Sequence, residues 1–148
     1  MKANELMLGD FFRVNKDGLC IKKGTVVRVV GIDGEDKLES KGLVCAVRCH
    51  PLDREQFDGG IWLSYLEPIS ITPEILEKLG FKKDTGGEEC WACRIGWLTP
   101  HHYNKKYIPT SWEVQICARS NSFSGVIKYV HQLQAALRLC KIEKEIEV

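Results

Sequence analysis

Hydrophobic residues between Gly9 and Ile69 occur in short runs that turn residues interrupt. Runs of β-branched and aromatic side chains between Gly, Asn and Asp clusters are typical of strands joined by tight turns. The predicted strands are Phe11–Val14, Thr25–Ile32, Leu43–Cys49 and Ile61–Leu66. Short antiparallel strands protect their edges best when the sheet closes on itself. We therefore expect an SH3-like small β-barrel over residues 1–69.

The pattern changes after Ile69, where a short helix is predicted from Pro73 to Leu79. Thr72 has a side chain that caps helices, and proline fits the first helical position that follows it. Gly80 supplies the left-handed residue that commonly ends a helix. This change of pattern predicts a boundary between two modules.

Two further strands are predicted in the second half, Glu89–Leu98 and Ser111–Ala118. Both are rich in aromatic and β-branched residues. The polar link from Thr99 to Thr110 is long for a connection in a compact domain, so a loop with a function is expected there.

The strongest helical pattern of the chain precedes its C-terminal tail. The apolar positions recur at spacings of four and three, which places them on one helix face. They are Val126, Val130, Leu133, Leu137 and Cys140. The tail Ile142–Val148 alternates apolar and charged residues, which predicts an edge strand. Residues 70–148 are therefore expected to form a smaller antiparallel sheet packed with two helices, and the whole chain an α+β protein.

The composition excludes several classes of protein. A hydrophobic content of 44% and a charged content of 28% exclude a disordered chain. With 21 Lys and Arg against 20 Asp and Glu, no global field draws the chain to nucleic acid or to an anionic membrane. The opening residues lack the apolar core of a secretion signal, and no apolar run reaches bilayer length. Seven cysteines, an odd number, also fit reduced thiols in a cytoplasmic protein.

Three segments resemble a known group of sequences. They are Met1–Leu6, the phrase TPEILEKLGF at Thr72–Phe81 and the phrase YVHQLQ at Tyr129–Gln134. They look like a family of small uncharacterised proteins from prophages and mobile elements of gut anaerobic bacteria. The resemblance implies a phage or mobile-element accessory protein in a bacterial cytoplasm, and it carries no catalytic residues with it.

One basic, aromatic-rich segment runs from Arg94 to Trp112 and contains no acid. Its aromatic rings could stack bases while its cations contact phosphates. The alternative is a solvated loop whose tryptophans pack into the core. The candidate ligand or nucleic-acid-binding residues are Arg94, Trp97, His101, His102, Tyr103, Lys105, Lys106 and Tyr107.

A zinc site is a further alternative, because Cys90, Cys93, His101 and His102 have the residue types that zinc prefers. If this run is one strand, positions three apart point to opposite faces, so both thiolates cannot reach one metal unless the chain turns. No other cofactor is expected.

Nothing in the sequence indicates catalysis. His50 and His131 lie in no recognisable pairing with a nucleophilic cysteine, and no glycine loop has the spacing of a nucleotide site. The aromatic residues of the front half, Phe11, Phe12, Phe57, Trp62 and Tyr65, offer a possible groove but must also fill a core. We therefore expect a non-enzymatic binding module that recognises a protein partner, with nucleic-acid binding as the first alternative.

Overall fold

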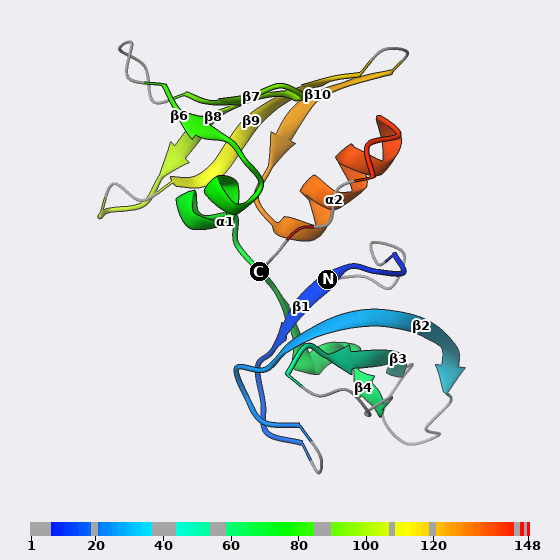
Figure 1. Ribbon diagram of the computed structural model, residues 1–148. Coiled ribbons are helices and arrows are strands. Elements are labelled where there is room, and N and C mark those ends of the chain that lie inside the picture. The colour runs from blue at the N-terminus through cyan, green and yellow to red at the C-terminus, as the bar shows by residue number, and fades with distance from the viewer. Residues whose placement is uncertain are drawn as a thin grey trace. The chain divides into compact units, whose positions relative to one another are not determined.

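The computed structural model contains two compact units, Met1–Ile69 and Ser70–Val148 (Figure 1). The structure describes residues 7–18, 21–36, 44–53, 59–84, 90–106, 109–118, 121–143, 146 and 148. For residues 32–36, 44–47 and 59 it describes the backbone alone. Among the described residues, no helix is long and apolar enough to cross a bilayer.

The first unit is one antiparallel sheet of five strands in the order β4-β3-β2-β1-β5. The strands are β1 (Phe11–Val14), β2 (Val26–Asp36), β3 (Val44–Pro51), β4 (Gly59–Trp62) and β5 (Leu66–Pro68). The register of β2 with β3 shifts between Val29 and Gly31 and again between Ile32 and Glu35. Because such bulges bend a strand and increase its twist, the sheet curls into a half-barrel (Figure 1).

The concave side of this sheet holds the core of the first unit, which contains Phe12, Val14, Val27, Val29, Cys49 and Leu66. The run Ile61–Leu66, predicted as one strand, is interrupted by a single 3-10 turn, η2 (Leu63–Tyr65). The turn is required because β4 and β5 lie at opposite edges of the same sheet. The backbone N–H of Asn15 donates to the carbonyl of Tyr65 at 2.8 Å and holds this turn against the end of β1.

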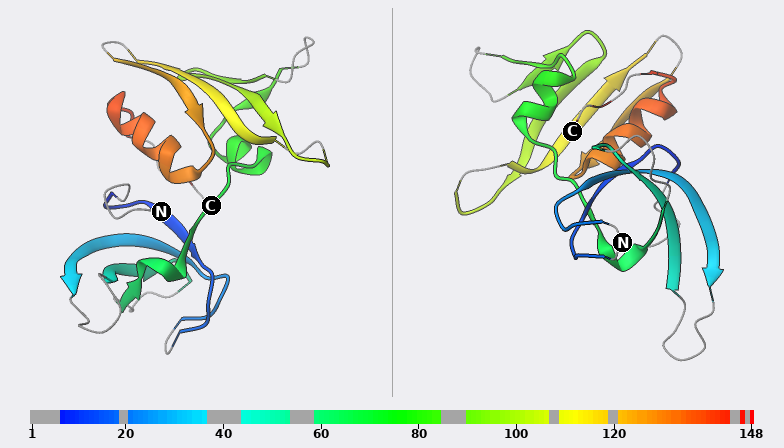
Figure 2. Two further views of the ribbon diagram at one scale, coloured as in Figure 1. Left: turned by 180° about the vertical axis from the view of Figure 1, so that it is seen from behind. Right: turned by 60° about the horizontal axis from the view of Figure 1, so that its bottom comes forward.

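The second unit is an antiparallel meander in the order β10-β9-β8-β7-β6. Its strands are β6 (Lys82–Lys83), β7 (Trp91–Cys93), β8 (Gly96–Tyr103), β9 (Pro109–Cys117) and β10 (Ser122–Ile127). Its helices are α1 (Pro73–Lys78) and α2 (Val130–Leu139), and both lie on one face of the sheet (Figure 2). The predicted α+β class is therefore confirmed, since the described residues form two antiparallel sheets and two helices.

The predicted signals of α1 are confirmed. The hydroxyl of Thr72 accepts a hydrogen bond from the backbone N–H of Ile75 at 3.4 Å. Pro73 occupies the first turn, and Gly80 has a φ of 78° after the last turn. Local capping chemistry thus determines both ends of this helix.

The apolar stripe of α2 is confirmed from Val130 to Cys140, but the helix does not reach back to Val126. That residue lies in β10 and is 50% exposed. The side-chain oxygen of Gln132 accepts hydrogen bonds from the backbone N–H groups of Lys128 and Tyr129 at 2.8 and 3.2 Å. These bonds satisfy donors at the helix start, so α2 begins only at Val130.

Two predictions about the middle of the second unit are wrong. The run Glu89–Leu98 is not one strand, because its described part from Cys90 onward folds into the β7–β8 hairpin with a turn at Arg94 and Ile95. The link Thr99–Thr110 is not a long loop, because its ends extend β8 and β9. The first correction adds a strand to the sheet, and the second lengthens β8 and β9.

The predicted edge strand at the tail is also wrong. The described tail residues Ile142, Glu143, Ile146 and Val148 lie in no strand. The N–H of Ile142 donates to the carbonyl of Leu137, and Lys141 has a φ of 55°. This is the Schellman arrangement, which turns the chain sharply at the end of α2. Beyond this turn Ile146 is only 1% exposed. The alternation of apolar and charged residues in the tail therefore reflects the burial of Ile146 and not an edge strand.

Candidate functional site

The predicted site residue Trp97 lies on β8, the central strand of the second sheet, and it is 43% exposed. Residues paired directly across antiparallel strands share a face. The register places Lys82, Ala92, Trp97, Gln115 and Ser124 in one such row. We call this side of the sheet the open face, since no described helix or strand of the second unit covers it (Figure 2).

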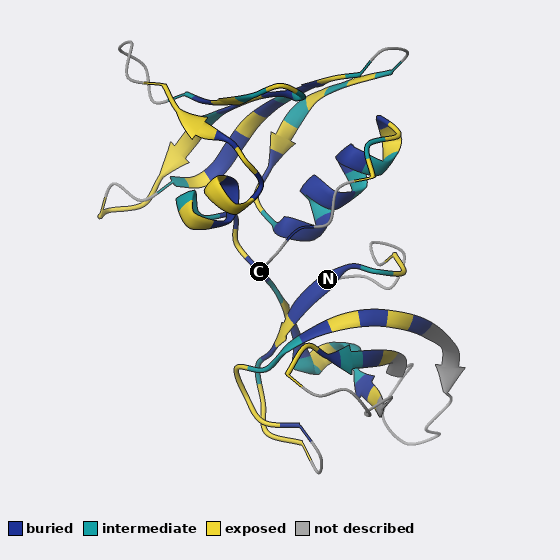
Figure 3. Cartoon of the chain, viewed as in Figure 1, coloured by how far each residue is buried: buried dark blue, intermediate teal, exposed yellow. Residues whose placement is uncertain are grey.

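The opposite face packs against the helices and is buried (Figure 3). Trp91 and Trp112 are 6% and 1% exposed, and Leu98 and Val114 are fully buried between them. Because successive strand residues point to opposite faces, the strand residues of the segment from Arg94 to Trp112 are divided between the two faces of the sheet. Trp97 is on the surface, whereas Trp112 belongs to the core.

The end of the β8–β9 hairpin carries most of the other predicted site residues. We call His101–Lys106 the hairpin tip. All six of its residues are exposed, and Tyr103 is 46% exposed. The side chain of Asn104 accepts a hydrogen bond from the N–H of Lys106 at 2.8 Å, and the hydroxyl of Thr110 donates to the carbonyl of His102 at 3.2 Å. The tip is therefore an ordered turn that presents two imidazoles, a phenol ring and two ammonium groups.

The predicted residues do not form a single cluster. Arg94 is exposed in the turn before β8, and the hairpin tip lies at the other end of this eight-residue strand. A strand of that length spans about 25 Å. Tyr107 lies outside the described residues.

The structure does not gather the four candidate zinc ligands. Cys93 pairs with Gly96 beside the β7–β8 turn, whereas His101 lies five residues farther along β8, about 16 Å away. Within the part of the chain that the structure describes, no three His, Cys, Asp or Glu side chains form a group that could hold a metal ion. Zinc binding stays a prediction, and elemental analysis of the purified protein would test it.

Two of the described thiols, Cys49 and Cys140, and one imidazole, that of His131, are buried and pack in the interior. Burial raises the pKa of the Cys49 thiol to about 12, so it stays protonated. Burial also raises the pKa of Cys140, with a smaller contribution from Cys117. The ring of His131 stacks on that of Tyr129 with centroids 5.7 Å apart, and it is largely buried on α2. In the front unit, Phe11 and Phe12 are buried, while Phe57 lies outside the described residues.

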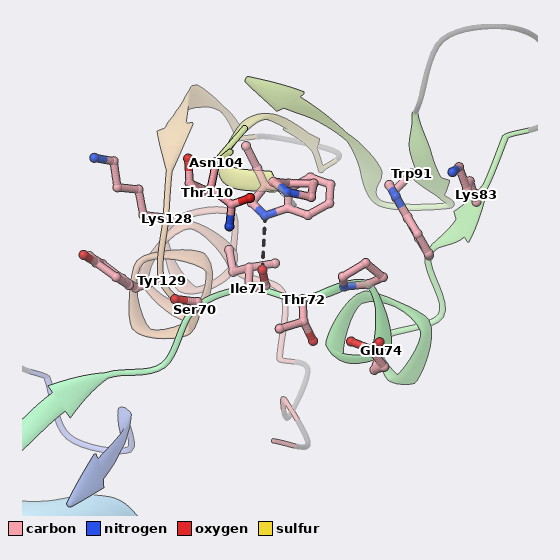
Figure 4. A pocket seen from close by; sticks show the side chains of 13 residues that line it. Ser70, Ile71, Thr72, Glu74, Lys83, Trp91, Asn104, Thr110, Lys128 and Tyr129 are labelled. Carbon is pink, nitrogen blue, oxygen red and sulfur yellow. Dashed lines mark hydrogen bonds between the residues drawn. The ribbon is translucent and has the colours of Figure 1, made fainter. Parts of the chain in front are cut away.

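A pocket of about 750 Å³ lies in the second unit, on the side of the sheet that faces the helices (Figure 4). Its floor includes the extended segment before α1. There the indole N–H of Trp112 donates to the carbonyl of Ile71 at 3.3 Å, and the N–H of Ile71 donates to the carbonyl of Lys128 at 3.1 Å. Lys83 and Trp91 line another side of the pocket, and Asn104 belongs to it as well.

Sequence reasoning missed this pocket. Its walls come from segments that begin at Ser70 and end at Tyr129. Hydrophobic periodicity reports which face of one element is buried, and it does not show where the ends of separate elements meet. Only the fold brings these segments together.

No protein-family description, curated protein or solved structure matches the chain. The resemblance of the segments Thr72–Phe81 and Tyr129–Gln134 to a mobile-element family therefore stays a prediction.

Proposed function

We propose that the protein is a non-enzymatic binding module that recognises a protein partner through the open face of its second unit. The observation that carries this proposal is the position of Trp97. A large indole stands 43% exposed on the central strand of the sheet, opposite the helices. Tryptophan is among the residues most enriched in the energetic hot spots of protein interfaces, which cluster near the centre of the interface.

The charge of the open face favours a protein over a nucleic acid. The row through Trp97 contains one cation, Lys82, and the neighbouring row contains one acid, Glu113, paired with Val126. Val126 is 50% exposed and adds apolar surface. A neutral surface with an aromatic centre and hydrogen-bonding neighbours matches the composition of protein interfaces.

Two finer proposals concern the setting. The first unit is an SH3-like barrel, which its curled sheet of five antiparallel strands around one hydrophobic cluster supports. The protein serves a phage or mobile element in a bacterial cytoplasm, which the resemblance of its two helix phrases supports.

The hairpin tip supports a second candidate function, nucleic-acid binding. Six successive exposed residues include two lysines, two histidines and Tyr103, with no acid among them. Cations of this kind contact phosphates while an exposed ring stacks on a base. Binding at the tip should therefore weaken steeply as salt is added.

One experiment separates the two functions. Tagged wild-type protein, Trp97→Ala and Tyr103→Ala are used to isolate partners from the cells that naturally produce the protein, and the affinity of each isolated partner is then measured. We expect a protein partner that binds Trp97→Ala about 30-fold more weakly, because a central hot spot contributes about 2 kcal/mol or more. Tyr103→Ala, which removes an aromatic of similar exposure, should bind that partner as the wild type does.

The opposite pattern favours the second candidate. Loss of bound nucleic acid in Tyr103→Ala and in Lys105→Ala with Lys106→Ala, with no change in Trp97→Ala, would assign binding to the hairpin tip. Equal retention of every partner by Trp97→Ala would refute the open-face proposal. Thermal unfolding of each variant checks that it still folds, which we expect because both aromatic side chains are about half exposed.

A further inference from the structure

The pocket of the second unit combines an apolar wall with charged groups at its margin (Figure 4). Its apolar lining residues are the half-buried Pro73 and Pro109 and the more deeply buried Ile71, Trp91 and Trp112. These tryptophans belong to the buried side of the sheet, so the pocket is separate from the open face. Small-molecule sites typically occupy about 300–1,000 Å³ and are mostly apolar with a few polar groups. The 750 Å³ of this pocket falls in that range.

The charges of the lining favour an anion. Lys83 and Lys128 stand at opposite sides of the pocket, and Glu74 is the single carboxylate among its lining residues (Figure 4). The hydroxyl residues Ser70, Thr72 and Thr110 add groups that donate or accept hydrogen bonds. Two ammonium groups against one carboxylate give the rim a net positive charge.

We propose that this pocket binds a nucleotide-sized anion, a flat aromatic ring that carries a phosphate group. The ring packs against the apolar part of the lining, where Pro73 and Pro109 are the accessible residues and the apolar surface of the ring leaves water. The phosphate lies at the rim near Lys83, where an ammonium group donates charge-assisted hydrogen bonds. Two sources have this chemistry, a free mononucleotide and the terminal nucleotide of a single strand.

The strand β6 provides a matched pair of variants. Lys82 and Lys83 are neighbours and both are exposed, but successive strand residues point to opposite faces. Lys83 lines the pocket, whereas Lys82 belongs to the open face. Helix α1 offers a second pair, because Glu74 lines the pocket and Glu77, which is also exposed, is absent from its lining.

The experiment titrates the full-length protein with adenosine 5′-monophosphate, adenosine and a five-nucleotide single strand by calorimetry. We expect adenosine 5′-monophosphate to bind, and adenosine to bind at least threefold more weakly because it has no charge for Lys83 to contact. Lys83→Gln should weaken binding of the monophosphate about threefold to tenfold, an effect of the size expected for a partly exposed ion pair or charged hydrogen bond. Lys82→Gln should leave it unchanged.

The sign of the Glu74 effect tests the proposed charge. Glu74→Gln should strengthen binding of the monophosphate about twofold to threefold, whereas Glu77→Gln should not change it. Unchanged or weaker binding by Glu74→Gln, or tighter binding of adenosine than of its monophosphate, would overturn the proposal. The absence of binding by all three probes would overturn it as well.

The single strand identifies the source. If it binds more tightly than the monophosphate and is equally sensitive to Lys83→Gln, the ligand is a strand terminus. If the monophosphate binds more tightly, the ligand is a free nucleotide. Strand binding that depends on Lys105 and Lys106 but not on Lys83 belongs to the hairpin tip and counts against the pocket. Trp97→Ala should leave binding of the monophosphate intact. The proposal for the pocket and the proposal for the open face can therefore be refuted separately.

Discussion

Replacing Gly96 with alanine should destabilise the second unit strongly. Gly96 lies at the start of β8 with a φ of 152°, a backbone region that residues with a side chain rarely adopt. A Cβ added there would overlap the carbonyl oxygen of Gln115 and would lie 2.9 Å from the Cα of Ile116. Both atoms belong to the backbone of β9, so no side-chain rotation relieves the overlap.

The magnitude follows from two contributions. Holding a non-glycine residue in this backbone region costs about 1–3 kcal/mol. Moving β8 away from β9 breaks one or two backbone hydrogen bonds, each worth about 1 kcal/mol net. Together they predict a loss of about 2–5 kcal/mol, which is a large part of the stability of a typical small domain.

Urea unfolding followed by tryptophan fluorescence measures this loss. Trp91, Trp97 and Trp112 all lie in the second unit, so its transition dominates the signal. Gly60→Ala, in the first unit, is the control for adding a methyl group where there is space, because a Cβ at Gly60 would meet no atom within 4 Å, and Trp62 of that unit reports its unfolding. It should change stability by less than about 0.5 kcal/mol. A Gly96→Ala variant that loses less than about 1 kcal/mol would refute the close approach of β8 to β9 and the reasoning built on it.

Four smaller predictions concern single residues. In the folded protein Cys49 should resist thiol reagents while the exposed Cys117 reacts, as mass spectrometry of the labelled protein would show; rapid labelling of Cys49 contradicts its burial. The pKa of Cys49 is about 12 when folded against an ordinary value of 9.0, so its contribution to stability is complete below pH 9 and is lost as the pH rises toward 12. Between pH 9 and 12, Cys49 should therefore lower the free energy of unfolding of the wild type by up to about 1.4 kcal/mol per pH unit, and Cys49→Ala should lack this fall in urea unfolding measured across that range. An equally steep fall of the free energy of unfolding in Cys49→Ala would contradict the prediction. Thr72→Ala should cost about 1 kcal/mol through loss of the α1 cap, with Thr72→Ser as the control that retains the cap. Lys141→Gly should raise the thermal midpoint because glycine adopts the left-handed φ of 55° without a steric penalty, and a lower midpoint would contradict this.

The sequence predicted those parts of the fold whose signals are local. Thr72 and Gly80 determine the two ends of α1 with their own side chain and backbone, and no distant residue is needed. The strand containing Phe12 is bounded by turn residues that would end a strand in any fold. The same reasoning failed at Ile61–Leu66, because only the sheet order reveals that this run must cross from one edge to the other.

The β7–β8 hairpin shows why other parts could not be predicted. Its turn at Arg94 and Ile95 contains none of the residues that usually mark turns, and Gly96 alone signals the close approach of another strand. Val126 is a related case, because it fits the spacing of the helical stripe and also the alternation of a strand. The hydrogen bonds to Gln132 decide between the two, and their geometry is not part of any hydrophobic pattern.

Both proposed sites depend on one feature of the second sheet, namely which of its residues point to which face. Trp97 faces outward and Leu98 inward, just as Lys82 faces the open face and Lys83 the pocket. Because side chains alternate with a period of two, a slip of one residue in the pairing would exchange the two faces completely. The close backbone contact at Gly96 admits no larger residue and thereby opposes such a slip. A Gly96→Ala variant that still folds should therefore lose affinity at the open face and at the pocket together, whereas Trp97→Ala affects the first alone and Lys83→Gln the second alone.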